Sequence, residues 1–206
     1  QKIDAAADHA IDAFIFDWYY YNDGLFLQRG LEDGFLKAAN NKRLRFGLMW
    51  ANHDWLDIQP AKLAPPPLQY PGKVTPQTFE RMTDYIVKTY FAHPSYWKID
   101  GRPYFSVYEL YRLVDSFGGV DATAEALKRF REKTRAAGFP DLHLNAVAWG
   151  IQLLPGKAVR DRVVMPGHLD VIVDTGGDNL PFGEFVAFGS ERLERGPVNR
   201  FEDAQA

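Results

Sequence analysis

The sequence predicts an α/β protein of the (β/α)8 TIM-like barrel class, in incomplete form, with about five strand–helix units. Three features support this expectation: strand-like and helix-like runs alternate, the strand-like runs are apolar, and polar and aromatic residues recur at their ends. Eight units of about 40 residues would need about 320, so residues 1–206 are interpreted as one barrel segment, a fragment of a longer catalytic domain.

The first half of the chain contains two expected strands and a long loop. Residues 11–16 form a short apolar run that is typical of a strand covered on both faces, and a helix is expected at residues 25–39. A second strand is expected at residues 44–50. The loop at about residues 52–74 is rich in proline, and a loop of this length in a compact domain is typical of a functional segment.

The next helix has a defined start, because Thr75 suits the N-cap and Pro76 suits the first turn. A third strand is expected at residues 103–108, after a turn at Asp100 and Gly101. The expected buried stripe of the helix consists of Phe79, Met82, Ile86, Val87 and Tyr90.

Two further strands complete the expected set. Asp121 is expected to cap a helix that ends at Gly138, where glycine suits a left-handed C-cap. Strands are then expected at residues 142–149 and 169–173, whereas the tail from Thr175 shows little regular pattern.

The alternation of strands and helices implies parallel strands joined by right-handed crossovers. A closed (β/α)8 barrel and an open, doubly wound sheet both fit this pattern. In either architecture the functional residues gather at the carboxyl ends of the strands.

The composition narrows the classes of function. A net charge of −3 gives no electrostatic reason to expect a nucleic-acid partner, and no apolar run approaches the ~20 residues that span a bilayer. The absence of cysteine excludes disulfides and thiolate catalysis. No metal site is expected, because H-E-x-x-H and similar spacings are missing, and no cofactor is expected. A doubly wound nucleotide-binding protein is a third alternative: the Gly-rich residues 174–179 permit it, although they lack the phosphate-loop patterns, and the aromatic strand ends disfavour it.

Aromatic and polar residues recur at successive strand ends, and this pattern favours a carbohydrate-binding cleft. Sugar rings present apolar C–H faces that stack on aromatic rings, and hydroxyl groups that bond to Asp, Asn, Glu and His side chains. Each cluster alone also fits core packing, so the interpretation requires Trp18, Trp50 and Tyr108 to reach a common rim. The residues expected to bind the substrate are Asp17, Trp18, Tyr20, Trp50, Asn52, His53, Tyr108, Glu109, Asn145 and Trp149.

Glycoside hydrolysis normally uses a pair of carboxyl groups that flank the scissile bond. Asp17, Asp54, Glu109 and Asp174 stand at suitable strand ends. Glu109 and Asp17 are the candidates for catalysis, although acids at strand ends also cap helices or orient neighbours, and the pattern singles out no pair.

Residues 10–22, 48–55, 96–105 and 138–150 resemble the glycoside hydrolase family 99-like proteins, also called WbsX-like, and the resemblance covers about residues 1–155. It implies a (β/α)8 barrel in bacterial glycan metabolism, either exported or cytoplasmic. It also implies kinship with retaining, endo-acting α-mannosidases and α-mannanases, which work through two carboxylates and an anhydrosugar-type intermediate. The Asn-Glu-Trp-x-Glu-Gly motif that supplies the family's carboxylates does not occur here.

The expected function is therefore that of a retaining glycoside hydrolase acting on a bacterial or mannose-containing glycan, with an oligosaccharide or polysaccharide as partner. Because the expected catalytic Glu pair is not in the segment, weak or no hydrolysis is expected from residues 1–206 alone. The alternative is a non-catalytic glycan-binding or polysaccharide-biosynthesis protein.

Overall fold

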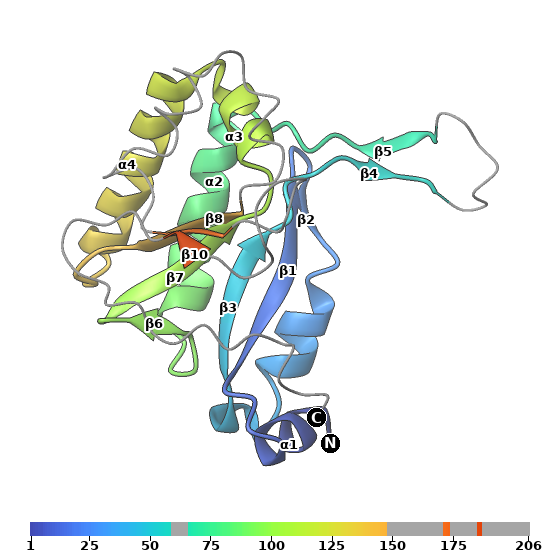
Figure 1. Ribbon diagram of the computed structural model, residues 1–206, viewed down its shortest axis with the longest axis vertical. Helices are drawn as coiled ribbons and strands as arrows, with labels where there is room; N and C mark the ends of the chain where they lie inside the picture. Colours follow the sequence, from blue (N-terminus) through green and yellow to red (C-terminus); the bar gives the residue numbers. More distant parts are fainter. Residues whose placement is uncertain (59–65, 148–170, 174–184, 187–206) are drawn as a thin grey trace.

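A computed structural model describes residues 1–58 and 66–147, together with the strands Val171–Val173 and Phe185–Val186. The centre of the molecule is a sheet of order β10-β9-β8-β7-β3-β1-β2 (Figure 1). Five of its strands are mutually parallel, and each lies beside the one that precedes it in this set. They are β1 (Ala13–Tyr21), β3 (Arg45–Trp50), β7 (Arg102–Val107), β8 (His143–Val147) and β9 (Val171–Val173).

This strand order bears on the two predicted architectures. A doubly wound sheet reverses its strand order at a switch point, and the five parallel strands show no such reversal. Among the described residues the sheet also stays open, since β10 (Phe185–Val186) forms one edge and β2 (Gly24–Phe26) the other. The prediction of a mainly parallel α/β fold is therefore confirmed, while the described strands do not close into a barrel.

One face of the sheet is covered by the helical segments. Aromatic side chains of these segments pack on even-numbered residues of β1 and β3 and on Phe105 of β7. For example, Phe79 on α2 lies 6.0 Å from Trp50, and Phe130 on α4 lies 5.3 Å from Phe105, measured between ring centroids. The segments are α1 (Lys2–Asp8), η1 (Gly30–Phe35), η2 (Asn41–Arg43), α2 (Pro76–Ile86), η3 (Val87–Phe91), α3 (Leu110–Phe117) and α4 (Val120–Ala136).

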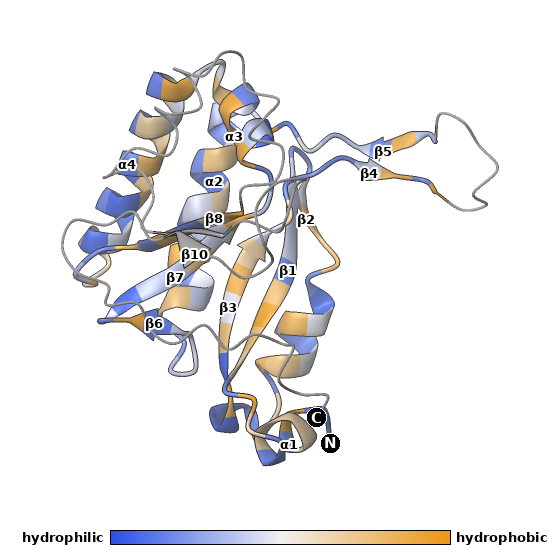
Figure 2. Ribbon diagram, in the orientation of Figure 1, coloured by the Kyte–Doolittle hydropathy of each residue, from blue (hydrophilic) through white to orange (hydrophobic). Residues whose placement is uncertain are grey.

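The main core lies between this face and the helices. Leu48, Phe46 and Phe105 have no exposed surface, and they pack with side chains from η1, α2 and α4. Figure 2 shows that β3 and the first half of β1 are mainly hydrophobic, whereas α4 carries both hydrophilic and hydrophobic residues. A strand covered by helices on one face needs apolar side chains on that face, because the burial of apolar surface drives the packing.

The opposite face of the sheet carries a row of more polar side chains. The strand registers align Asp17 on β1 with Met49 on β3, then with Ser106 on β7 and Asn145 on β8. Successive side chains of a strand point to opposite faces, so this row cannot take part in the helix-covered core.

Several predicted details are confirmed. The side chain of Thr75 caps α2 by accepting a hydrogen bond from the Thr78 backbone N–H at 3.1 Å. Gly138 has a φ of +94° after the end of α4, as a left-handed cap requires. Asp100 and Gly101 form the turn between β6 (Lys98–Ile99) and β7, both with positive φ.

The predicted helix at residues 25–39 is wrong in its first part. Leu25 and Phe26 belong to β2, which pairs antiparallel with Tyr19–Tyr21, and only Gly30–Phe35 is helical, as a π-helix. Leu27 has a φ of +56°, which is incompatible with a right-handed helix at that position. The predicted helical range is thus divided between β2 and η1. Asp121 likewise lies in the first turn of α4 rather than at its cap, which is Gly119.

The proline-rich loop forms an arm. Its two short strands, β4 (Trp55–Leu56) and β5 (Leu68–Tyr70), pair antiparallel, and the hairpin projects away from the sheet (Figure 1). Its base is held by Asn22, whose side chain donates to the Lys73 carbonyl and accepts from the Thr75 N–H. Within the described ranges, no helix is long and apolar enough to cross a membrane.

Candidate functional site

A pocket of about 520 Å³ lies where β1, β3 and β7 approach their carboxyl ends. It is formed by the polar face of the sheet, the loop after β3, the base of the arm and the start of α3. Its lining combines carboxylates, a guanidinium, an imidazole and a phenol with apolar side chains. The lining residues are Asp17, Met49, Ala51, His53, Asp54, Leu56, Tyr108, Glu109 and Arg112.

Asp17 comes from within β1 rather than from a loop after it. Its side chain is exposed on the pocket side, and within the described part of the chain no hydrogen bond or ion pair reaches its carboxylate. Its charge acts on the neighbouring phenol: burial first and then the negative charge of Asp17 raise the pKa of Tyr19. Asp17 therefore offers the pocket a carboxylate that the fold itself does not use.

Arg112 joins the two other carboxylates of the pocket. Its Nη2 lies 2.9 Å from Asp54 Oδ2, and its Nε lies 3.5 Å from Glu109 Oε2. Asp54 is held from a second side, because its Oδ1 accepts a 2.7 Å hydrogen bond from the backbone N–H of Gly72. A Cβ at Gly72 would lie 2.4 Å from the Asn52 carbonyl oxygen, so glycine permits this approach. Asp54 and Arg112 thus fix the returning chain of the arm against α3.

Asn52 braces the turn between β7 and α3. Its Oδ1 accepts a 2.7 Å hydrogen bond from the Glu109 N–H, and its Nδ2 donates to the Glu109 carbonyl at 2.8 Å. The side chain is 0% exposed. The expectation that Asn52 lines the cleft is therefore wrong: it positions Glu109, which does line the pocket.

Trp18, Tyr20 and Trp50 do not reach the pocket. The common rim of Trp18, Trp50 and Tyr108 that the carbohydrate interpretation required is therefore wrong, and these tryptophans give that interpretation no support. All three side chains that miss the pocket are buried on the helix-covered face. The indole Nε1 of Trp18 donates to the Tyr90 hydroxyl at 3.1 Å, and that of Trp50 donates to the Tyr20 carbonyl at 3.2 Å. The reason is strand parity, the alternation of successive side chains between the two faces of the sheet. Residues 17–22 were interpreted as the end of a strand at residues 11–16, but β1 continues to Tyr21, so its even-numbered side chains point to the helix-covered face.

A different set of rings lies beside the pocket. The imidazole of His53 lies 5.8 Å from the ring of Tyr108 and 5.9 Å from that of Tyr19, and it stacks on Trp55 at 6.2 Å. Tyr19 and Trp55 were not among the predicted site residues. Tyr19 lies two residues after Asp17 in β1 and therefore points to the same face of the sheet, and Trp55 ends the aromatic and polar stretch at residues 50–55. Phe26 and Tyr70 continue this aromatic cluster toward the arm.

The tautomer of the His53 ring follows from its contact. Its Nδ1 lies 2.9 Å from the Asp54 carbonyl oxygen, which can only accept a hydrogen bond. Nδ1 therefore carries a proton, and Nε2 is the acceptor in the tautomer that this contact selects. His53 adds a second hydrogen-bond acceptor to a pocket that already contains the Asp17 carboxylate.

Asn145 lies on the polar face but does not line the pocket. It is buried, and its Nδ2 donates to the Ser106 hydroxyl at 2.7 Å, in the same row of the sheet as Asp17. Trp149 and Asp174 lie outside the described residues. Of the predicted site residues, the structure brings Asp17, His53, Tyr108 and Glu109 together in one pocket.

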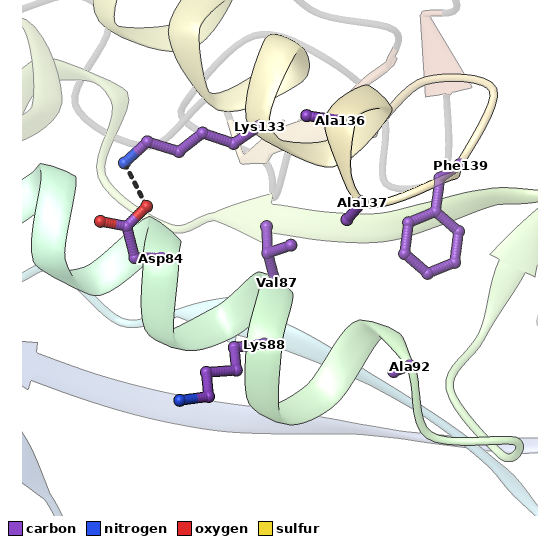
Figure 3. Close-up of a pocket in the computed structure, with 8 residues that line it drawn as sticks. All are labelled: Asp84, Val87, Lys88, Ala92, Lys133, Ala136, Ala137 and Phe139. Atoms are coloured by element: carbon purple, nitrogen blue, oxygen red, sulfur yellow. Dashed lines mark ion pairs between the residues drawn. The ribbon is translucent and has the colours of Figure 1, made fainter.

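A second hollow of about 460 Å³ lies between α2–η3 and α4, on the outer side of the helices (Figure 3). Val87, Ala137 and Phe139 provide apolar lining. Lys133 is engaged by Asp84 at 2.7 Å and by Glu80 at 2.6 Å. This hollow is remote from the strand ends. Over the described ranges, no group of three or more His, Asp or Glu side chains is placed to hold a metal ion.

The family comparison agrees with the resemblance found in the residues. The model of the family described as glycosyltransferase WbsX matches residues 1–170. The chain belongs to the WbsX family. No curated protein and no solved structure gave a match. This membership indicates a carbohydrate-active WbsX-family protein.

Proposed function

We propose that the strand-end pocket binds an oligosaccharide or polysaccharide, as the substrate-binding part of a carbohydrate-active enzyme. The observation that carries the proposal is the convergence of Asp17, His53, Tyr108 and Glu109 on one pocket in a chain of the WbsX family. Carboxylates and an imidazole suit sugar hydroxyls, and the Tyr108 and His53 rings suit the apolar face of a pyranose.

The proposal includes a (β/α)8 barrel as the complete architecture. Support comes from the sequential order of the five parallel strands and from the helices that cover a single face. In such barrels the active site is built at the carboxyl ends of the strands, which is where the pocket lies. Residues 1–206 would then be one segment of that barrel.

The reaction that we propose is retaining glycoside hydrolysis, with Asp17 and Glu109 as the carboxylates that act at the glycosidic bond. Such a reaction needs one carboxyl group as acid and base and a second group on the other side of the bond. Asn52 holds the Glu109 backbone, and Arg112 Nε forms an ion pair with the Glu109 carboxylate at 3.5 Å. The Asp17 carboxylate is exposed to the pocket and has no hydrogen bond or ion pair in the described residues, so it is available to a substrate.

A second candidate is non-catalytic glycan binding or polysaccharide assembly. The absence of an Asn-Glu-Trp-x-Glu-Gly motif from residues 1–206 favours non-catalytic binding, and the family's description as a glycosyltransferase favours polysaccharide assembly. The same pocket would then hold the growing glycan.

The test is a titration of the purified chain with mannose-containing and bacterial oligosaccharides, followed by chemical-shift changes or calorimetry. We expect binding that Tyr108→Ala and Asp17→Ala each weaken about fivefold or more, while Lys88→Ala in the second hollow leaves it unchanged. A chain that binds none of the oligosaccharides would contradict the proposal. Reducing ends released from the same glycans separate the candidates: Asp17→Asn and Glu109→Gln must abolish any turnover if hydrolysis is the function.

A further inference from the structure

The charge of the pocket is unbalanced. Asp17, Asp54 and Glu109 contribute three carboxylates, and Arg112 is the single Lys or Arg side chain among the lining residues. The carboxylates of the lining therefore outnumber its guanidinium by three to one. Low-dielectric walls strengthen such a field inside a cleft, so it acts on the charge of any ligand that enters.

The hydrogen-bonding capacity of the pocket has the same bias. Arg112 Nη2 is directed to Asp54, which is also bound by the Gly72 N–H. Arg112 Nε lies 3.5 Å from Glu109 Oε2 and is buried without a hydrogen bond among the described residues. The acceptors, by contrast, include groups with no partner in the described part of the chain, namely the Asp17 carboxylate and the His53 Nε2 lone pair. A ligand that fits this pocket supplies hydrogen-bond donors and positive charge.

Resting on the proposed function, we infer that the pocket selects an amino sugar with a free ammonium group, which pairs with Asp17 while its ring contacts Tyr108 and His53. An ammonium supplies three N–H donors and the charge that the pocket lacks. An N-acetyl group removes the charge, and a uronic acid adds a carboxylate to an already negative site. Binding therefore weakens in the order free amine, N-acetylated or neutral sugar, uronic acid.

The test compares matched oligosaccharides of glucosamine and of mannosamine, each as the free amine and in N-acetylated form, with a uronic acid oligomer of equal length. We expect the free amine to bind about fivefold more tightly than its acetylated partner, because the charge pair with Asp17 is partly exposed to solvent. The preference should shrink as salt is raised from 0.05 to 0.5 M, by screening.

Two variants assign the preference to one side chain. Asp17→Asn should lose most of the preference for the amine, keeping only what Asp54 and Glu109 contribute. Asp23→Asn removes the same charge from the exposed turn between β1 and β2, outside the pocket, and should keep the preference. An unchanged preference in Asp17→Asn would overturn the assignment to Asp17.

The outcomes also separate this inference from the proposed function. Equal or tighter binding of the acetylated or uronic acid forms would overturn the amino-sugar selection and leave glycan binding intact. Absence of binding by every oligosaccharide, neutral mannose oligomers included, would overturn both.

Discussion

The two faces of the same sheet use their aromatic residues in opposite ways. On the helix-covered face Trp18 and Trp50 are fully enclosed, and both indole N–H groups are satisfied inside the protein. On the other face Tyr108 and His53 line a pocket next to carboxylates. Asp17 and Trp18 are neighbours in the chain, yet one faces the pocket and the other the core. The difference shows that strand parity, more than residue type, separates binding residues from packing residues at these strand ends.

The largest expected effect contrasts Trp50 with Tyr108. Trp50→Ala empties a fully buried site and should lower the free energy of unfolding by about 3–5 kcal/mol, measured by urea denaturation. Tyr108→Ala should cost about 1 kcal/mol or less, because Tyr108 is partly exposed, and should mainly weaken glycan binding. Equal losses of stability in the two variants would break the distinction between the faces.

The next effect concerns the brace beneath Glu109. Asn52→Ala removes two hydrogen bonds and leaves a buried N–H and C=O without their partner, so stability should fall by about 2–3 kcal/mol. Asn22→Ala is a matched control, since Asn22 also bridges a backbone carbonyl and N–H, but at an exposed position where water can replace it. Its loss should stay near 0.5 kcal/mol, and an equal loss would show that burial is not the cause.

A smaller effect concerns the hydrogen-bond network on the helix face. The Tyr90 hydroxyl donates to Glu32 at 2.6 Å and accepts from Trp18 at 3.1 Å, so Tyr90→Phe should destabilise the protein by about 1–2 kcal/mol. Tyr85 donates to the same Glu32 oxygen but is only partly buried. Tyr85→Phe should therefore cost less, as measured by thermal unfolding. A larger cost for Tyr85→Phe would contradict this account of the network.

The smallest effect is a dependence of stability on pH. Burial alone would raise the pKa of Glu80, but hydrogen bonds and charges from Lys133 and Arg129 outweigh it and lower the pKa below 4.5. A lowered folded-state pKa gives stability that is present above the unfolded pKa and lost as the pH falls through the folded pKa. Because these side chains are partly exposed, the contribution should be below about 1 kcal/mol. Glu80→Gln should flatten the urea-derived stability profile below pH 4.5, and an unchanged profile would contradict the assignment.

Much of the fold followed from local signals. Thr75 with Pro76 predicted the start of α2, Gly138 predicted the end of α4, and the apolar runs predicted β3, β7 and β8, because caps and buried strands have strong residue preferences. The exception was residues 25–39, where Leu25 and Phe26 pair with the tyrosines of β1 instead of joining a helix. A short apolar run cannot reveal which partner covers it.

The sequence by itself determined which residues stand near the strand ends, and so it identified Asp17, His53, Tyr108 and Glu109 together with the family. Only the tertiary structure decided which of these side chains meet. It extended β1 to Tyr21, which directs Trp18 and Tyr20 into the core and Asp17 into the pocket, and it brought Arg112 and Asn52 to Glu109. Asp17 and Glu109, which are 92 residues apart in the sequence, line one pocket because of strand register and parity, which are set by packing of the whole sheet.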